Sequence, residues 1–124
     1  MAHVETHAVE AKSFDSPDER RPFEGKGHAD VVTVAGHPVA RGRFEPGWKW
    51  STNLKPIAGT DSCEVSHLGY CVQGRMRIHM DDGGEYDISA GEAAAIPRGH
   101  DAEVIGDEAC IWVDFGEISE YAKR

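Results

Sequence analysis

Short runs of β-forming residues, separated by glycine-rich turns about every ten residues, constrain the fold of this chain more than any other feature. The clearest pair is an alternating run at 75–80, an Asp-Asp-Gly-Gly turn at 81–84 and a return run at 85–88. No helical stretch of useful length interrupts the pattern. The sequence therefore predicts an all-β barrel or sandwich of about six to eight strands. Further strands are predicted at 29–35, 39–44, 93–96, 100–105 and 109–115.

The chain has 124 residues, which suits one domain with a real hydrophobic core. Residues 1–27 are polar and broken by Ser16-Pro17 and Arg21-Pro22, so we expect an extended N-terminal arm with little structure of its own. The predicted division is arm 1–27, barrel 28–118 and C-terminal tail 119–124.

Charge and composition exclude several classes of partner. A formal net charge of −9 disfavours both nucleic acid and anionic membrane surfaces, and no apolar run reaches the length of about 20 residues that a membrane-spanning helix needs. The start of the chain carries no signal-peptide pattern, so we expect a cytoplasmic protein. The odd count of three cysteines argues against a disulfide framework.

Metal-capable side chains share one face of a predicted strand. Because side chains alternate between the two faces of a strand, Asp61, Cys63 and His67 would project to the same side as the small residues Gly69 and Cys71. The small residues would leave room there, as in the wall of a cavity. Cys71 and Cys110 themselves lie in apolar runs and suit small core positions.

A second stretch would bring another imidazole to the entrance of a strand. Residues 97–99, Pro-Arg-Gly, form a turn signal, and the chain then restarts as a strand with His100 and Ala102 on one face. Nearby in the predicted barrel, Trp48 and Trp50 place both indoles on one side, where they could line a pocket or plug a barrel end.

The spacing of these stretches resembles the paired motifs of the cupin superfamily, small β-barrels or jelly rolls that often hold a divalent metal. Gly74 stands seven residues after His67, so His67 occupies the position of the family's Glu, and Asp61 and Cys63 occupy those of its two His. The family's second motif matches at Gly91, Pro97 and Gly99. Its His position falls on Ala102, and His100, two residues earlier, is the substitute.

The resemblance covers roughly residues 44–115. The same run of residues is also similar to small, mostly uncharacterised bacterial cupins. The resemblance implies that His67 and His100, with Cys63 and Asp61, bind a divalent metal ion, and that Trp48, Trp50, Cys71 and Ala102 line the pocket around it. A thiolate, carboxylate and imidazole set suits zinc or iron first, with nickel, copper or manganese as alternatives, rather than magnesium or calcium.

Each of these side chains also has an ordinary structural interpretation. His67 could be a hydrogen-bonded core imidazole, His100 a solvated turn residue, and Cys63 a buried cysteine. Asp61 could bond its own backbone in a turn after Gly59.

Two classes of function stay open. In the first, the domain binds a metal and a small organic ligand without turning it over; in the second, it is a small metalloenzyme of dioxygenase, isomerase or hydrolase type. The sequence shows no general base on the face of the expected ligands, since Glu64 and Glu103 have the wrong strand parity, which favours the binding domain. The resemblance further implies a homodimer.

Overall fold

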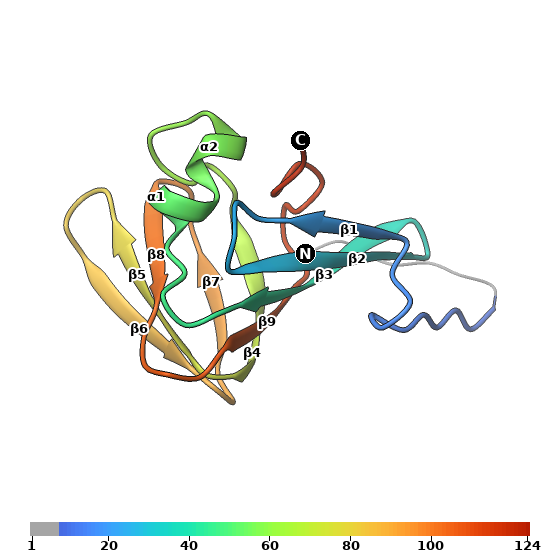
Figure 1. The fold of residues 1–124 in the computed structure, drawn as a ribbon. Coiled ribbons are helices and arrows are strands. Elements are labelled where there is room, and N and C mark those ends of the chain that lie inside the picture. The colour runs from blue at the N-terminus through green and yellow to red at the C-terminus, as the bar shows by residue number, and fades with distance from the viewer. Residues whose placement is uncertain (1–7) are drawn as a thin grey trace.

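The computed structural model in Figure 1 describes residues 8–124, so the first seven residues of the predicted arm lie outside the described part. A six-stranded sheet with the order β1-β2-β3-β9-β4-β7 packs against a three-stranded sheet with the order β6-β5-β8, and every pairing is antiparallel. The prediction of an all-β jelly roll is confirmed. The strands are β1 (Glu19–Pro22), β2 (Gly27–Val34), β3 (His37–Phe44), β4 (His67–Gln73), β5 (Arg75–Met80), β6 (Glu85–Ser89), β7 (Ala93–Ile96), β8 (His100–Val104) and β9 (Cys110–Asp114); the helices are α1 (Trp50–Asn53) and α2 (Lys55–Ala58).

The predicted hairpins form where their turn residues allow them. β5 and β6 pair around the 81–84 turn, in which Gly83 takes a φ of 99° and the amide of Gly84 donates to the Asp82 carboxylate. β2 and β3 pair through a two-residue turn at Ala35 and Gly36, both with positive φ. That backbone matches the twist of the two strands, which explains the tight connection.

Three segments differ from the sequence-based expectation. Residues 19–22 of the predicted arm form β1, which pairs with β2 and extends the larger sheet. The chain after Trp48 makes two single-turn helices, separated at Leu54, which the sequence analysis did not predict. The strand expected from Asp61 onward begins only at His67, because the preceding residues form a loop.

The core lies between the two sheets, and β4 shows how it is filled. His67, Gly69 and Cys71 point inward, whereas Leu68, Tyr70 and Val72 are exposed on the outer face. A Cβ atom on Gly69 would lie 2.1 Å from the carbonyl oxygen of Val113 and 2.6 Å from the indole of Trp112. The space beside Gly69 therefore belongs to Trp112 and is not open to a ligand.

The C-terminal segment closes one end of the barrel. It lies beside β1, at the end of the molecule that carries α1 and α2 (Figure 1), and it buries Ile118 and Ala122. The buried guanidinium of Arg21 donates through Nη1 to the carbonyls of Ile118 and Tyr121, at 2.7 and 2.9 Å, and is itself held by Glu19. A residue from the start of the fold therefore fixes its last segment.

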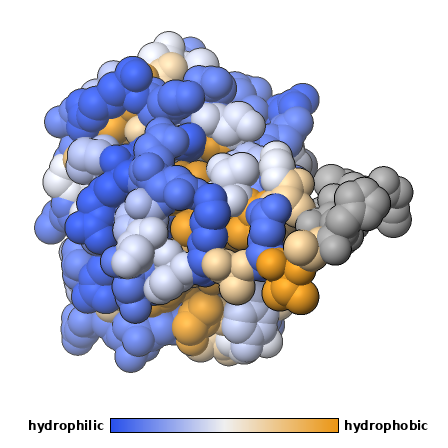
Figure 2. Space-filling model, turned by 90° about the vertical axis from the view of Figure 1, so that its right-hand side faces the viewer, coloured by the Kyte–Doolittle hydropathy of each residue, from blue (hydrophilic) through white to orange (hydrophobic). Residues whose placement is uncertain are grey.

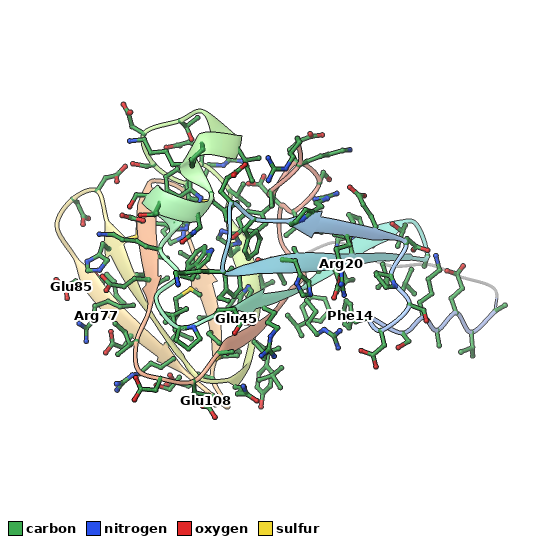
Figure 3. All side chains as sticks on the ribbon, viewed as in Figure 1. Phe14, Arg20, Glu45, Arg77, Glu85 and Glu108 are labelled. Atoms are coloured by element: carbon green, nitrogen blue, oxygen red, sulfur yellow. The ribbon has the colours of Figure 1, made fainter. Side chains whose placement is uncertain are left out.

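One face of the molecule is mostly polar. The face in Figure 2 is predominantly hydrophilic, with small separated hydrophobic patches. Arg77 and Glu85 project outward from the three-stranded sheet (Figure 3), and Arg77 pairs with Asp87 across β5 and β6 at 2.8 Å. In the described range, 8–124, no helix has the length and apolar character needed to cross a membrane.

Candidate metal centre

Three side chains from separate segments meet inside the barrel. Cys63 lies in the loop before β4, His67 is the first residue of β4, and His100 is the first residue of β8. The Cys63 thiol lies 3.7 Å from Nε2 of His67, and one ligand atom from each of the three residues lies within 4.8 Å of the others. All three side chains are buried, so the cluster is a preformed internal site.

The backbone brings Cys63 to His100. An isolated antiparallel bridge joins these residues: the amide of Cys63 donates to the carbonyl of His100 at 2.8 Å, and the amide of Gly99 donates back to the carbonyl of Cys63 at 2.8 Å. Gly99 has a φ of 87°, a left-handed conformation that glycine adopts without strain. The Pro-x-Gly turn therefore positions both the second imidazole and the thiol.

Hydrogen bonds to Nδ1 fix the orientation of both imidazoles. Nδ1 of His100 lies 2.7 Å from the carbonyl of Pro97, and Nδ1 of His67 lies 2.5 Å from a carboxylate oxygen of Asp114. A carbonyl oxygen only accepts hydrogen bonds, so Nδ1 of His100 carries the proton, and the Asp114 carboxylate favours the same tautomer in His67. Nε2 of each ring then holds the free lone pair of the neutral form, which is the arrangement of a metal ligand.

Cys63 and His67 each stabilise the charged form of the other. Burial opposes ionisation of Cys63, but hydrogen bonds with His100 and His67 outweigh it and lower the pKa of the thiol to about 6. Burial likewise opposes the charged form of His67, but Asp114 and the Cys63 sulfur raise the pKa of this imidazole to about 9. The thiolate, the form that binds metals, is therefore available at neutral pH.

Asp114 is a functional residue that the sequence analysis missed. Its carboxylate accepts from His67, from the indole Nε1 of Trp112 at 2.9 Å and from the amide of Gly116 at 2.8 Å. The signal was present in the sequence, because Asp114 is the one charged residue in an apolar strand and shares the face of Cys110 and Trp112. Buried polar groups need such hydrogen-bond partners.

The cluster borders a small cavity of about 40 Å³, counted as the space open to the centre of a water molecule. All four predicted pocket residues, Trp48, Trp50, Cys71 and Ala102, lie along it. The rest of its lining is largely aliphatic and aromatic. A volume of this size holds roughly three water molecules or a ligand of a few non-hydrogen atoms.

Tyr121 is a second residue that sequence reasoning missed, and no periodicity marked it. Its ring packs edge-on against His67, with centroids 5.4 Å apart, and it lines both the inner cavity and a second hollow on the outside. Trp50 and Cys63 also border both spaces. Burial, and then the negative charges of Cys63 and Asp114, hold the pKa of the Tyr121 phenol well above its usual value, so the phenol stays protonated.

No protein-family model matches the chain, and no curated protein matches its sequence. Solved structures do match. A protein of unknown function from Acinetobacter sp. ADP1 is 16% identical over 81% of this chain and 90% of its own, with a TM-score of 0.57. A sugar phosphate isomerase of the cupin superfamily from Silicibacter pomeroyi is 20% identical over 85% of this chain and 73% of its own, with a TM-score of 0.58.

A variant of oxalate decarboxylase from Bacillus subtilis is 19% identical with a TM-score of 0.58, and the match covers 91% of this chain but only 31% of that longer one. The chain has a cupin-type fold. At these identities the likeness establishes the architecture of the cupin barrel, and the reactions named for the neighbours belong to those proteins.

Within this cupin barrel, the expectation that Asp61 joins the ligands is wrong. Its carboxylate is fully exposed and lies 3.7 Å from the ammonium of Lys55. The parity argument assumed a continuous strand from residue 61, whereas the bridge to His100 turns the loop at Cys63 and leaves Asp61 outside. The structure gathers Cys63, His67 and His100, and adds Asp114 behind His67.

The donor set of this site fits a metal ion. Zinc bonds of about 2.3 Å to sulfur and 2.0 Å to nitrogen place two tetrahedral ligand atoms about 3.5 Å apart, close to the 3.7 Å between Cys63 and His67. Metal-bound histidines usually donate their second N–H to a carboxylate or a carbonyl, as both histidines do here. The residues present are therefore suited to a borderline metal, with three protein ligands and space beside them.

Proposed function

We propose that this cupin-type domain holds a divalent metal ion with Cys63, His67 and His100, and offers it to a small organic ligand in the barrel cavity. The observation that carries the proposal is the shared orientation of the two imidazoles: each Nδ1 is engaged, by Asp114 or by the Pro97 carbonyl, so each Nε2 is free to bind beside the thiol. A histidine that only fills the core would not need a second imidazole and a thiol beside its free nitrogen.

The choice of metal follows from the three donors. One thiolate and two imidazoles favour zinc or iron over magnesium or calcium, which require oxygen ligands; nickel, copper and manganese are the alternatives. Three protein ligands differ from the four that close a structural zinc site, which supports a site that accepts a further ligand. A bound ion would supply Lewis acidity, or oxygen activation if it is iron.

Binding without turnover is the function we favour, because the described lining of the cavity offers no free proton acceptor. Asp114 accepts three hydrogen bonds, and the phenol of Tyr121 stays protonated. General acid–base chemistry needs a group whose proton can move at working pH. The alternative, a small metalloenzyme of dioxygenase, isomerase or hydrolase type, is supported by the enzymes named among the structural neighbours.

Elemental analysis of untagged protein tests the metal proposal. We expect about one equivalent of metal in the purified protein, and its loss in Cys63→Ser, His67→Ala and His100→Ala. Cys110→Ala and His79→Ala are matched controls, since both residues lie outside the cluster, and should retain the metal. Full metal content in all three ligand variants would overturn the proposal.

A ligand and substrate screen of the metal-loaded protein separates the two classes. Thermal stabilisation by a small compound without product supports a binding domain. Product formation under oxygen that disappears with the metal supports the enzyme. The homodimer, the cytoplasmic location and the domain boundaries at residues 27 and 118 stay predictions; light scattering tests the first.

A further inference from the structure

Trp48 carries a buried hydrogen-bond donor without a partner. Its side chain is 1% exposed. Among the buried side-chain nitrogen and oxygen atoms of residues 8–124, its indole Nε1 is the one without a hydrogen-bond partner. Leaving a buried donor unpaired costs about 1–3 kcal/mol, so native proteins rarely do so without a reason. Trp112, in the same cavity wall, shows the contrast, since its Nε1 donates to Asp114.

The indole of Trp48 is held firmly in place. Its backbone amide donates to the carbonyl of Glu45 at 3.0 Å, and its own carbonyl accepts from the amide of Val104 at 2.9 Å. The ring packs edge-on against Phe44, with centroids 4.6 Å apart, and also contacts Phe23. Trp48 lines the inner cavity, so an occupant of that cavity is the candidate acceptor for this preorganised donor.

The same cavity borders the proposed metal ligands, so a molecule in the cavity would meet both the metal site and the indole of Trp48. Its lining contains no lysine or arginine, and a volume of about 40 Å³ admits only a few non-hydrogen atoms. One thiolate against a divalent ion leaves a single positive charge among the direct ligands, to which a monoanion would bind. The Asp114 carboxylate in the same lining, behind His67, offsets that charge for the site as a whole, so the site has no charge left for a dianion. A second carboxylate would be buried without a cation, at a large cost.

We propose that Trp48 is the specificity-determining donor for a small monocarboxylate, which places one oxygen toward the metal and the other on the indole N–H of Trp48. This inference rests on the metal centre proposed above. The apolar remainder of the ligand would contact aliphatic residues of the lining such as Ala102, Ile78 and Ile96.

Cobalt-loaded protein provides the test, because its visible absorption reports both thiolate binding and changes of the further ligand. Acetate has a second oxygen for Trp48, whereas imidazole, the comparison probe, has no second acceptor. In Trp48→Phe, acetate affinity should fall tenfold or more, the range for a hydrogen bond to a charged group, with imidazole affinity unchanged. Trp50→Phe, the same change in the same cavity, should leave the ratio of the two affinities as in the wild type.

The outcomes separate this inference from the metal proposal. Absence of a cobalt–thiolate spectrum in the wild type would reject the metal centre itself. Cobalt binding with equal acetate affinity in the wild type and Trp48→Phe would reject only the role of Trp48, and so would imidazole binding without acetate binding.

A measurement on the wild type covers the case in which Trp48→Phe does not fold. The chain has three tryptophans, so the indole N–H signals of the zinc-loaded protein are easily followed by NMR. Acetate should shift the Trp48 signal downfield and slow its exchange with solvent. An unchanged Trp48 signal at saturating acetate would contradict the proposal.

Discussion

The Asp114 carboxylate lies 2.5 Å from Nδ1 of His67 and holds the opposite nitrogen of that ring toward the Cys63 thiol. The carboxylate is fixed in turn by Trp112 and by the amide of Gly116. The position of one ligand nitrogen therefore depends on a residue that would not touch the ion.

Asp114→Asn should lower metal affinity by about 10–100-fold, because the neutral amide no longer holds the ring as a carboxylate does. Competition with a coloured chelator measures this affinity. Asp87→Asn, which alters an exposed carboxylate paired with Arg77, is the control and should bind metal as the wild type does. Equal affinity in Asp114→Asn would remove the positioning role of Asp114.

Metal uptake should release about one proton at pH 7.5. Between the pKa of Cys63, about 6, and that of His67, about 9, the thiol is already ionised and the imidazole still carries a proton that an ion must displace. Metal affinity should therefore fall about tenfold per pH unit from 9 toward 6, and more steeply below 6. Calorimetry in buffers of different ionisation enthalpy counts the protons, and a value of zero would argue against Cys63 and His67 as ligands.

The stability of the metal-free protein should change little between pH 6.5 and 9 on account of this pair. The contribution of His67, whose folded pKa is raised, is complete below 6.5 and is lost as the pH rises through about 9. The contribution of Cys63, whose folded pKa is lowered, is complete above 9.0 and is lost as the pH falls through about 6. One contribution grows as the other declines.

Cys63→Ser exposes the contribution of His67 alone. In this variant, urea unfolding should show the free energy of unfolding falling by up to about 1.4 kcal/mol per pH unit above 6.5, since Asp114 still favours the charged imidazole. A flat profile in the variant would mean that His67 is neutral throughout.

Cys63 should be the first cysteine to be alkylated in metal-free protein at neutral pH. Burial raises the pKa of both Cys71 and Cys110, so these thiols stay protonated, and only Cys63 also borders the outer hollow. Mass spectrometry after brief iodoacetamide treatment locates the label, and a bound ion should protect Cys63. Equal labelling of all three thiols would be inconsistent with this arrangement.

Arg21→Ala should loosen the C-terminal segment over the cavity and destabilise the protein by about 3 kcal/mol, because one buried and one partly buried carbonyl lose a charged donor. Hydrogen exchange of residues 117–124 and urea unfolding measure the two effects. Arg124→Ala is the control within the same segment: its ion pair with Glu24 is exposed and should contribute less than about 1 kcal/mol. Unchanged exchange in Arg21→Ala would show that other contacts hold the segment.

The sequence predicted what depends on local pattern. The alternation at 75–80, the glycine turns and the apolar run at 109–115 define elements within the chain, and the structure reproduces them, the last as β9. Cys63, His67 and His100, which the motif spacing singled out, also lie together in the structure, although β4 and β8 belong to different sheets and Cys63 lies in a loop. The identity of the metal and its ligand has no such local signature.

What the sequence did not predict depends on tertiary contacts. Asp61 was misplaced because strand parity holds only where a strand continues, and the bridge of Cys63 to His100 ends it. Tyr121 was missed because its position is set by Arg21, which is one hundred residues away in the chain. A contact between residues so far apart in the chain produces no periodic pattern in the sequence.

The Arg21 contact also sets the order in which the site can mature. During synthesis, the thiol and both imidazoles leave the ribosome before the segment that shields them, so an ion could enter through the uncovered end of the barrel. Once Ile118 and Tyr121 dock on Arg21, the segment covers that end of the cavity, and only the outer hollow beside Cys63 borders the site from the surface. For the metal centre proposed above, opening of residues 117–124 would therefore add a step to the exchange of the ion, beside the breaking of its bonds to sulfur and nitrogen.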